Sequence, residues 1–73
     1  MGVTDTLELK AQCTRKKISL EELAKRIGIN PATLHRKING TSEFQQSEIQ
    51  SIKRALELSD EQMIAIFFNT NYA

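Results

Sequence analysis

Four side chains able to contact base pairs lie within the short run from Ala32 to Arg36. The guanidinium of Arg36 can donate two hydrogen bonds to a guanine, and the Thr33 hydroxyl can bond to either partner of a base pair. His35 can give or accept one hydrogen bond, while Ala32 and the Thr33 methyl can touch a thymine methyl. These residue types suit contact with base edges in a groove; the alternative is simple exposure to solvent.

The segment that carries these side chains has the pattern of a short helix over residues 31–38. Asn30-Pro31 supplies a capping side chain and a proline suited to the first helical position, and Asn39-Gly40 is typical of a helix end. At about 100° per residue, Leu34 and Ile38 define the buried side. The outward set is then Ala32, Thr33 and Arg36, flanked by His35 and Lys37.

A second helix is predicted directly before it, over residues 20–27. Ser19 and Glu22 match a capping box, and apolar residues from Leu20 to Ile27 form a complete helical stripe. Only Gly28-Ile29-Asn30 separates the two helices. A turn this short, with a glycine able to take positive φ, makes the helices cross steeply. We therefore expect a helix-turn-helix over about 19–39.

Three further helices are expected, over about 5–16, 46–57 and 60–68. No segment alternates apolar and polar residues with a period of two, so the predicted fold is all-α with five short helices. The whole chain, 1–73, is expected to form a single domain, with loose termini at 1–4 and 69–73.

Charge is unevenly spread along the chain. Residues 9–40 hold eight Lys or Arg and two Glu, a balance of +6, whereas residues 41–73 have a balance of −3. A basic middle favours an anionic partner such as nucleic acid. Mixed charge on solvated helix faces is the alternative.

Several other classes of function are not expected. The single cysteine, Cys13, cannot form an intrachain disulfide, and it lies on the buried stripe of the first helix as a small core residue. His35, the only histidine, has no carboxylate beside it that could orient a catalytic base. We expect no enzyme activity, catalytic residue, metal or cofactor. No apolar run could span a bilayer, so a cytoplasmic protein is expected.

The final predicted helix is crowded with apolar residues, from Met63 to Phe68. Ile64, Phe67 and Phe68 are the expected inward set, which leaves Met63 and Ile66 exposed as a surface for a protein partner. The alternative is a helix buried on all sides.

The stretch SLEELAKRIGINPATLHRKING, from Ser19 to Gly40, resembles the lambda-repressor-like family of Cro and repressor helix-turn-helix proteins. The resemblance implies that Ala32, Thr33 and Arg36 face bases of double-stranded operator DNA. It also implies that Asn39 and the Thr41 region lie near phosphates. The full set of candidate DNA-backbone contacts is Lys17, Asn30, Lys37, Asn39, Thr41 and Gln46. For the basic run ending at Lys17, pairing with the helix C-terminus is an equal alternative.

The stretch HRKINGTSEFQQSEIQSIKRALELSDEQMIAIFF is similar to small regulators from temperate phages of Gram-positive bacteria, of the Cro-position or modulator-of-repression kind. This implies a regulator of a lysis–lysogeny switch that binds its operator as a homodimer, or a modulator that forms a heteromer with the phage repressor. Three positions depart from the family pattern and each lacks a usual hydrogen-bond donor: Leu20, Pro31-Ala32 and Gln45-Gln46. Because these departures reduce the expected contacts with DNA, they favour a role in which binding to another protein matters as well.

Overall fold

The computed structural model describes residues 4–68, and this part of the chain is all-α. Its five helices, in chain order, are α1 (Thr6–Arg15), α2 (Leu20–Ile27), α3 (Pro31–Ile38), α4 (Gln46–Ala55) and α5 (Asp60–Phe67). The predicted fold class is confirmed, and the helix bounds agree to within two residues at each end. The expected loose termini, 1–4 and 69–73, lie outside the described residues except for Thr4.

Side-chain caps explain where the helices begin. The Asp5 carboxylate accepts the Glu8 N–H at 3.1 Å, and the Ser19 hydroxyl accepts the Glu22 N–H at 3.0 Å. Ser59 caps α5 through the Gln62 N–H at 3.0 Å. Each bond satisfies an N–H that has no partner inside its own helix. These starts were readable from the sequence because capping is a local interaction.

Three helices, α1, α4 and α5, end one or two residues earlier than predicted, and after α1 and α4 the chain turns into the left-handed region. Lys17 has φ 57° just after α1, and Glu57 has φ 54° just after α4. A left-handed residue cannot continue a right-handed helix. The apolar stripe of α4 nevertheless runs on, since Leu56 is fully buried beyond its last helical residue.

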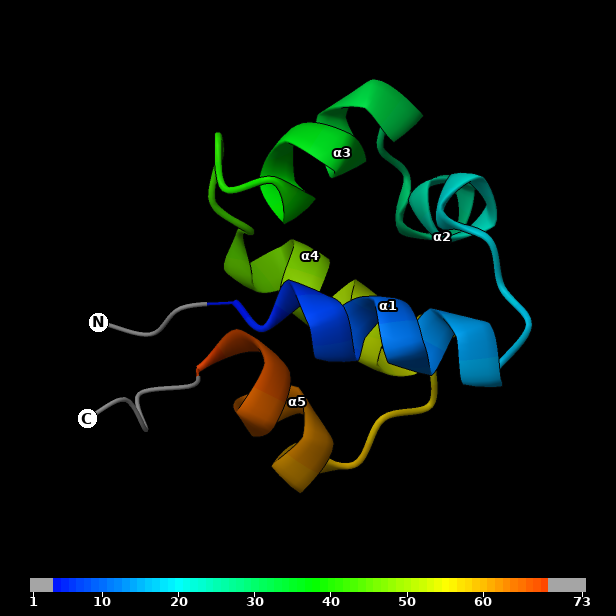
Figure 1. Cartoon of the computed structure of the whole chain (residues 1–73), viewed down its shortest axis with the longest axis vertical. Helices are drawn as coiled ribbons and strands as arrows, with labels where there is room; N and C mark the ends of the chain where they lie inside the picture. The colour runs from blue at the N-terminus through cyan, green and yellow to red at the C-terminus, as the bar shows by residue number, and fades with distance from the viewer. Residues whose placement is uncertain (1–3, 69–73) are drawn as a thin grey trace.

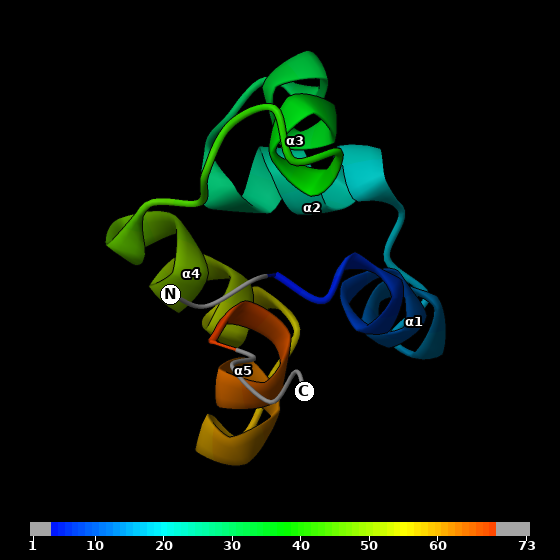
Figure 2. The same ribbon diagram turned by 60° about the vertical axis from the view of Figure 1, so that its left-hand side comes forward.

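The helices surround a single apolar core in the described residues. α2 packs against α3 and α4, α1 packs against α2 and α5, and α4 packs against α5. Figures 1 and 2 show α3 at one end of the longest axis and α5 at the other. Fully buried leucines and isoleucines come from every helix: Leu9, Leu23, Leu34, Ile52, Leu56 and Ile66.

The inward face of α5 differs from the prediction. Ile66 is 0% exposed and Phe67 is 4% exposed, whereas Ile64 is 52% and Phe68 is 40% exposed. Met63 is half-buried against the core, within 4.0 Å of the Gln50 amide nitrogen. The prediction that Met63 and Ile66 form an exposed partner surface is therefore wrong for Ile66. The helix turns the i, i+4 pair Ile64 and Phe68 outward instead.

Candidate nucleic-acid interface

The turn between α2 and α3 sets the angle of the helix-turn-helix. Gly28 adopts φ 79°, and its N–H donates to the Lys25 carbonyl at 3.3 Å. The next N–H, from Ile29, donates to the Ala24 carbonyl at 3.0 Å. These paired bonds end α2 in a Schellman motif that needs a left-handed residue, which glycine adopts without strain. Ile29 packs against the core, so α3 leaves α2 steeply (Figure 1).

The outer face of α3 presents the predicted base-contacting residues. Ala32, His35 and Arg36 are exposed, and Thr33 is half-buried. A guanidinium nitrogen of Arg36 donates to the Thr33 hydroxyl at 3.2 Å. This bond restricts the long Arg36 side chain before any ligand binds, which lowers the entropy lost on contact. The structure therefore gathers all four predicted residues on one helix at one end of the molecule (Figure 2).

Lys37 does not have the exposure that a phosphate contact requires. Its side chain is 8% exposed, its ammonium lies 3.0 Å from a Glu48 carboxylate oxygen, and it donates to the Glu43 carbonyl at 2.9 Å. The prediction of Lys37 as a backbone contact is contradicted, because its charge is engaged within the fold. Leu34, Lys37 and Ile38 follow i, i+3, i+4 spacing, and this pattern already placed Lys37 beside the buried stripe. The sequence did not indicate that Glu48 would be the ion-pair partner of Lys37.

The other candidate backbone contacts are all exposed. Asn30 uses its side-chain oxygen to accept the Ala32 N–H at 2.8 Å, which leaves its amide N–H₂ group as a donor. Asn39 ends α3, and the N–H of Thr41 donates to the Arg36 carbonyl at 2.9 Å. This bond holds the loop after α3 against the same helix. Gln46 is the first residue of α4, and Lys17 lies in the turn before α2.

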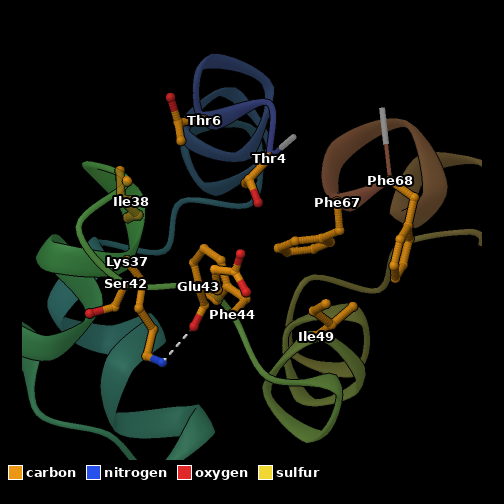
Figure 3. A pocket seen from close by; sticks show the side chains of 11 residues that line it. Thr4, Thr6, Lys37, Ile38, Ser42, Glu43, Phe44, Ile49, Phe67 and Phe68 are labelled. Atoms are coloured by element: carbon orange, nitrogen blue, oxygen red, sulfur yellow. Dashed lines mark hydrogen bonds between the residues drawn. The ribbon is translucent and has the colours of Figure 1, made fainter. Parts of the chain in front are cut away.

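A hollow of about 500 Å³ lies beside this region, between the start of α1, the loop after α3 and the end of α5 (Figure 3). Its apolar lining includes the rings of Phe44 and Phe67, which meet edge to face at a centroid distance of 5.3 Å. Thr4 points into the hollow from the start of the described chain (Figure 3). Lys37 forms part of the wall, so the hollow adjoins the element that carries the candidate interface.

The described residues also show the surroundings of the single thiol. Cys13 is buried, as predicted, and burial raises the pKa of its thiol, which disfavours the reactive thiolate. Within residues 4–68, no group of three or more His, Cys, Asp or Glu is placed to hold a metal ion. In the same residues, no helix is long and apolar enough to cross a bilayer.

Comparison with known protein families agrees with this geometry. No curated protein and no solved structure matches the chain significantly. The model of the Cro/C1-type HTH DNA-binding domain matches residues 8–66, which include α2, α3 and the loop between them. This match covers well over half of the sequence. The chain therefore belongs to the Cro/C1-type helix-turn-helix family of DNA-binding transcriptional regulators.

Proposed function

We propose that this chain regulates a phage lysis–lysogeny switch by reading operator DNA with α3 in the major groove. The observation that carries the proposal is the exposed face of α3, where the Arg36 guanidinium is already held by the Thr33 hydroxyl. A helix placed at the end of a domain fits the width of a major groove. The protein would act where the operator lies, in the cytoplasm of a bacterial host.

Two sets of contacts follow from this docking. The proposed base contacts on α3 are Ala32, Thr33, His35 and Arg36. Around them, the proposed contacts to the DNA backbone are Lys17, Asn30, Asn39, Thr41 and Gln46. Among the backbone set only Lys17 carries a charge, and neutralised phosphates determine the salt dependence of binding. We therefore expect a shallow dependence of affinity on salt.

The first experiment selects duplex DNA from a random library with the wild-type chain, then measures binding of variants to the selected site. We expect Arg36→Ala to weaken binding by about 1–3 kcal/mol and to relax preference at one base pair. Arg54→Ala is the matched control, because it removes the same charge from an exposed position near the end of α4. Equal losses for the two variants, or equal losses on selected and scrambled DNA, would refute base recognition by Arg36.

A homodimer is part of the proposal, because two copies related by a two-fold axis would read two half-sites. The selected sequences should then contain inverted repeats with centres about one helical turn apart. Sedimentation of the complex gives the number of chains bound to each duplex. A solitary half-site occupied by a single chain would argue against the dimer.

Exposed apolar residues at the far end favour a second candidate, a modulator that complexes the phage repressor and changes its occupancy of DNA. Ile64 and Phe68 are exposed on α5, which Figures 1 and 2 place at the opposite end from α3. Such a surface could bind a protein without covering the DNA-reading face. In this case Ile64→Asp should abolish capture of the phage repressor. Thr14→Asp adds the same charge on the exposed face of α1 and should not. If capture survives Ile64→Asp, α5 is not the repressor-binding surface.

A further inference from the structure

The ammonium of Lys37 joins three parts of the helix-turn-helix region. Lys37 belongs to α3, its first partner is the Glu43 carbonyl in the loop after α3, and its second is the Glu48 carboxylate on α4. The distances are 2.9 and 3.0 Å, and the two charged side chains are only 8% and 13% exposed. Figure 3 shows the Lys37 side chain reaching across to the Glu43 carbonyl. An ion pair this enclosed is weakly screened by salt.

The Glu48 carboxylate also accepts a backbone hydrogen bond. The same oxygen that faces Lys37 also accepts the backbone N–H of Gln45, at 2.8 Å. Gln45 is the N-cap of α4, so this bond fixes the residue at which the helix begins. A single carboxylate therefore ties the α3 lysine to the first turn of α4.

The loop between these anchors carries proposed DNA-backbone contacts. At its start, the Gly40 N–H donates to the Lys37 carbonyl at 3.2 Å, and the Thr41 N–H donates to the Arg36 carbonyl. At its end, Lys37 and Glu48 hold Glu43 and Gln45. The loop is thus bonded to α3 at both ends, and the second attachment is made by the ammonium that also pairs with Glu48.

We propose that Lys37 and Glu48 are positioning residues for DNA recognition, which set the distance between the base-reading face of α3 and the backbone-contacting loop. Neither residue touches DNA. The inference rests on the proposed function, because the two surfaces must engage one duplex in fixed register. A misplaced loop would compete with base contacts for the duplex, so specificity should fall more than general affinity.

The sharpest test neutralises Glu48 and leaves Lys37 in place. In Glu48→Met, which removes the acceptor oxygen as well as the charge, a positioning role predicts that the ratio of affinities for selected and scrambled duplexes falls, by about tenfold if one base contact is lost. If Lys37 were instead a phosphate ligand, the same change would release its charge and strengthen binding to the selected duplex. Asp60→Asn removes one negative charge from a residue paired with Lys53 and should leave the ratio unchanged. A raised or unchanged ratio in Glu48→Met overturns the proposal.

Salt dependence supplies an independent measurement. Lys37→Met should lower the same ratio while the slope of log affinity against log salt matches that of Lys53→Met, the control of equal charge. If Lys37 contacted a phosphate, Lys37→Met would reduce the magnitude of this slope by about 0.9 more than Lys53→Met does. That loss of slope would overturn the proposal. Measurements are made at a temperature where circular dichroism shows every variant fully folded.

Lys37→Met leaves the largely buried Glu48 carboxylate without its ion-pair partner and can fail to fold for that reason. A double variant that removes both charges avoids this problem. Lys37→Met with Glu48→Leu should fold and still show the lowered ratio, since apolar side chains cannot hold the Glu43 carbonyl or the Gln45 N–H. Recovery of the wild-type ratio by this double variant overturns the proposal. A purely structural pair would change the melting temperature and leave the ratio of the folded proteins unchanged.

A measurement without DNA separates this inference from the proposed function. Amide hydrogen exchange of Gln45 should accelerate about tenfold or more in Glu48→Met relative to Asp60→Asn, because the Gln45 N–H loses its acceptor. If the wild-type chain enriches no DNA sequence, the proposed function fails whatever the exchange shows. If DNA is enriched but exchange and the affinity ratio match those of the control, only the positioning role fails.

Discussion

At the scale of single residues, Asp60 shows how a surface pair changes a proton equilibrium. Its carboxylate lies 2.8 Å from the Lys53 ammonium, which connects the first residue of α5 to α4. The hydrogen bond from Lys53, together with the attraction of its charge, holds the pKa of Asp60 below its ordinary value. Because Asp60 is exposed, this pair contributes modestly to stability and weakens in salt.

We expect Lys53→Met to raise the pKa of Asp60 towards its ordinary value, because the hydrogen bond and the positive charge are both removed. A lowered folded-state pKa means that the pair stabilises the fold above the ordinary pKa, and that this contribution disappears as the pH falls through the lowered value. Titration of the Asp60 carboxyl by NMR measures the change directly. Lys25→Met, on the exposed face of α2, is the control. Identical titrations in wild type and Lys53→Met would contradict the assignment.

Single residues also show where sequence analysis stops. The exposure of Ala32, His35 and Arg36 was predictable, because a helix with two buried apolar positions turns its opposite face outward. The burial of Lys37 was not, because a basic residue near a DNA-binding helix normally stays in solvent unless a partner compensates it. That partner, Glu48, belongs to another helix, and its approach depends on how the chain folds back after α3.

At the scale of whole helices, caps provide a local test. We expect Ser19→Ala to lower the free energy of unfolding by about 0.5–2 kcal/mol, because the Glu22 N–H loses its acceptor. Ser19→Gly should cost only a few tenths of a kcal/mol, since glycine is tolerated at this position. Urea denaturation of the three proteins gives the comparison. Equal stability of wild type and Ser19→Ala would show that the cap contributes nothing to α2.

The same scale explains the error in α5. Helix starts and the ends of α2 and α3 were predicted well because capping residues and left-handed glycines act on their immediate neighbours. The orientation of α5 was predicted badly because apolar residues occupy most of its circumference between Met63 and Phe68, so no single stripe stands out. Contacts with α1 and α4 decide which side is buried, and these contacts involve residues distant in sequence.

At the scale of the whole molecule, the corrected orientation of α5 predicts unequal effects of two isoleucines. Ile66→Ala should lower the free energy of unfolding by about 2–5 kcal/mol, since its side chain is fully buried. Ile64→Ala should change it by about 0.5 kcal/mol or less, because half of its side chain is already in solvent. Thermal and urea unfolding of both variants measure the difference. Similar losses would mean that α5 packs with the opposite face.

One backbone hydrogen bond joins a residue near the start of the chain to a residue near its end. The Asp5 N–H donates to the Ile66 carbonyl at 2.6 Å, which connects the cap of α1 to the last turn of α5. Closing so long a loop has a high entropic cost, so this contact should form late in folding, after α2, α3 and α4 have assembled through contacts close in sequence. Local unfolding of the native protein should follow the opposite order. The outer helices α1 and α5 should detach as a pair, while the DNA-reading helices stay folded in a partly opened form.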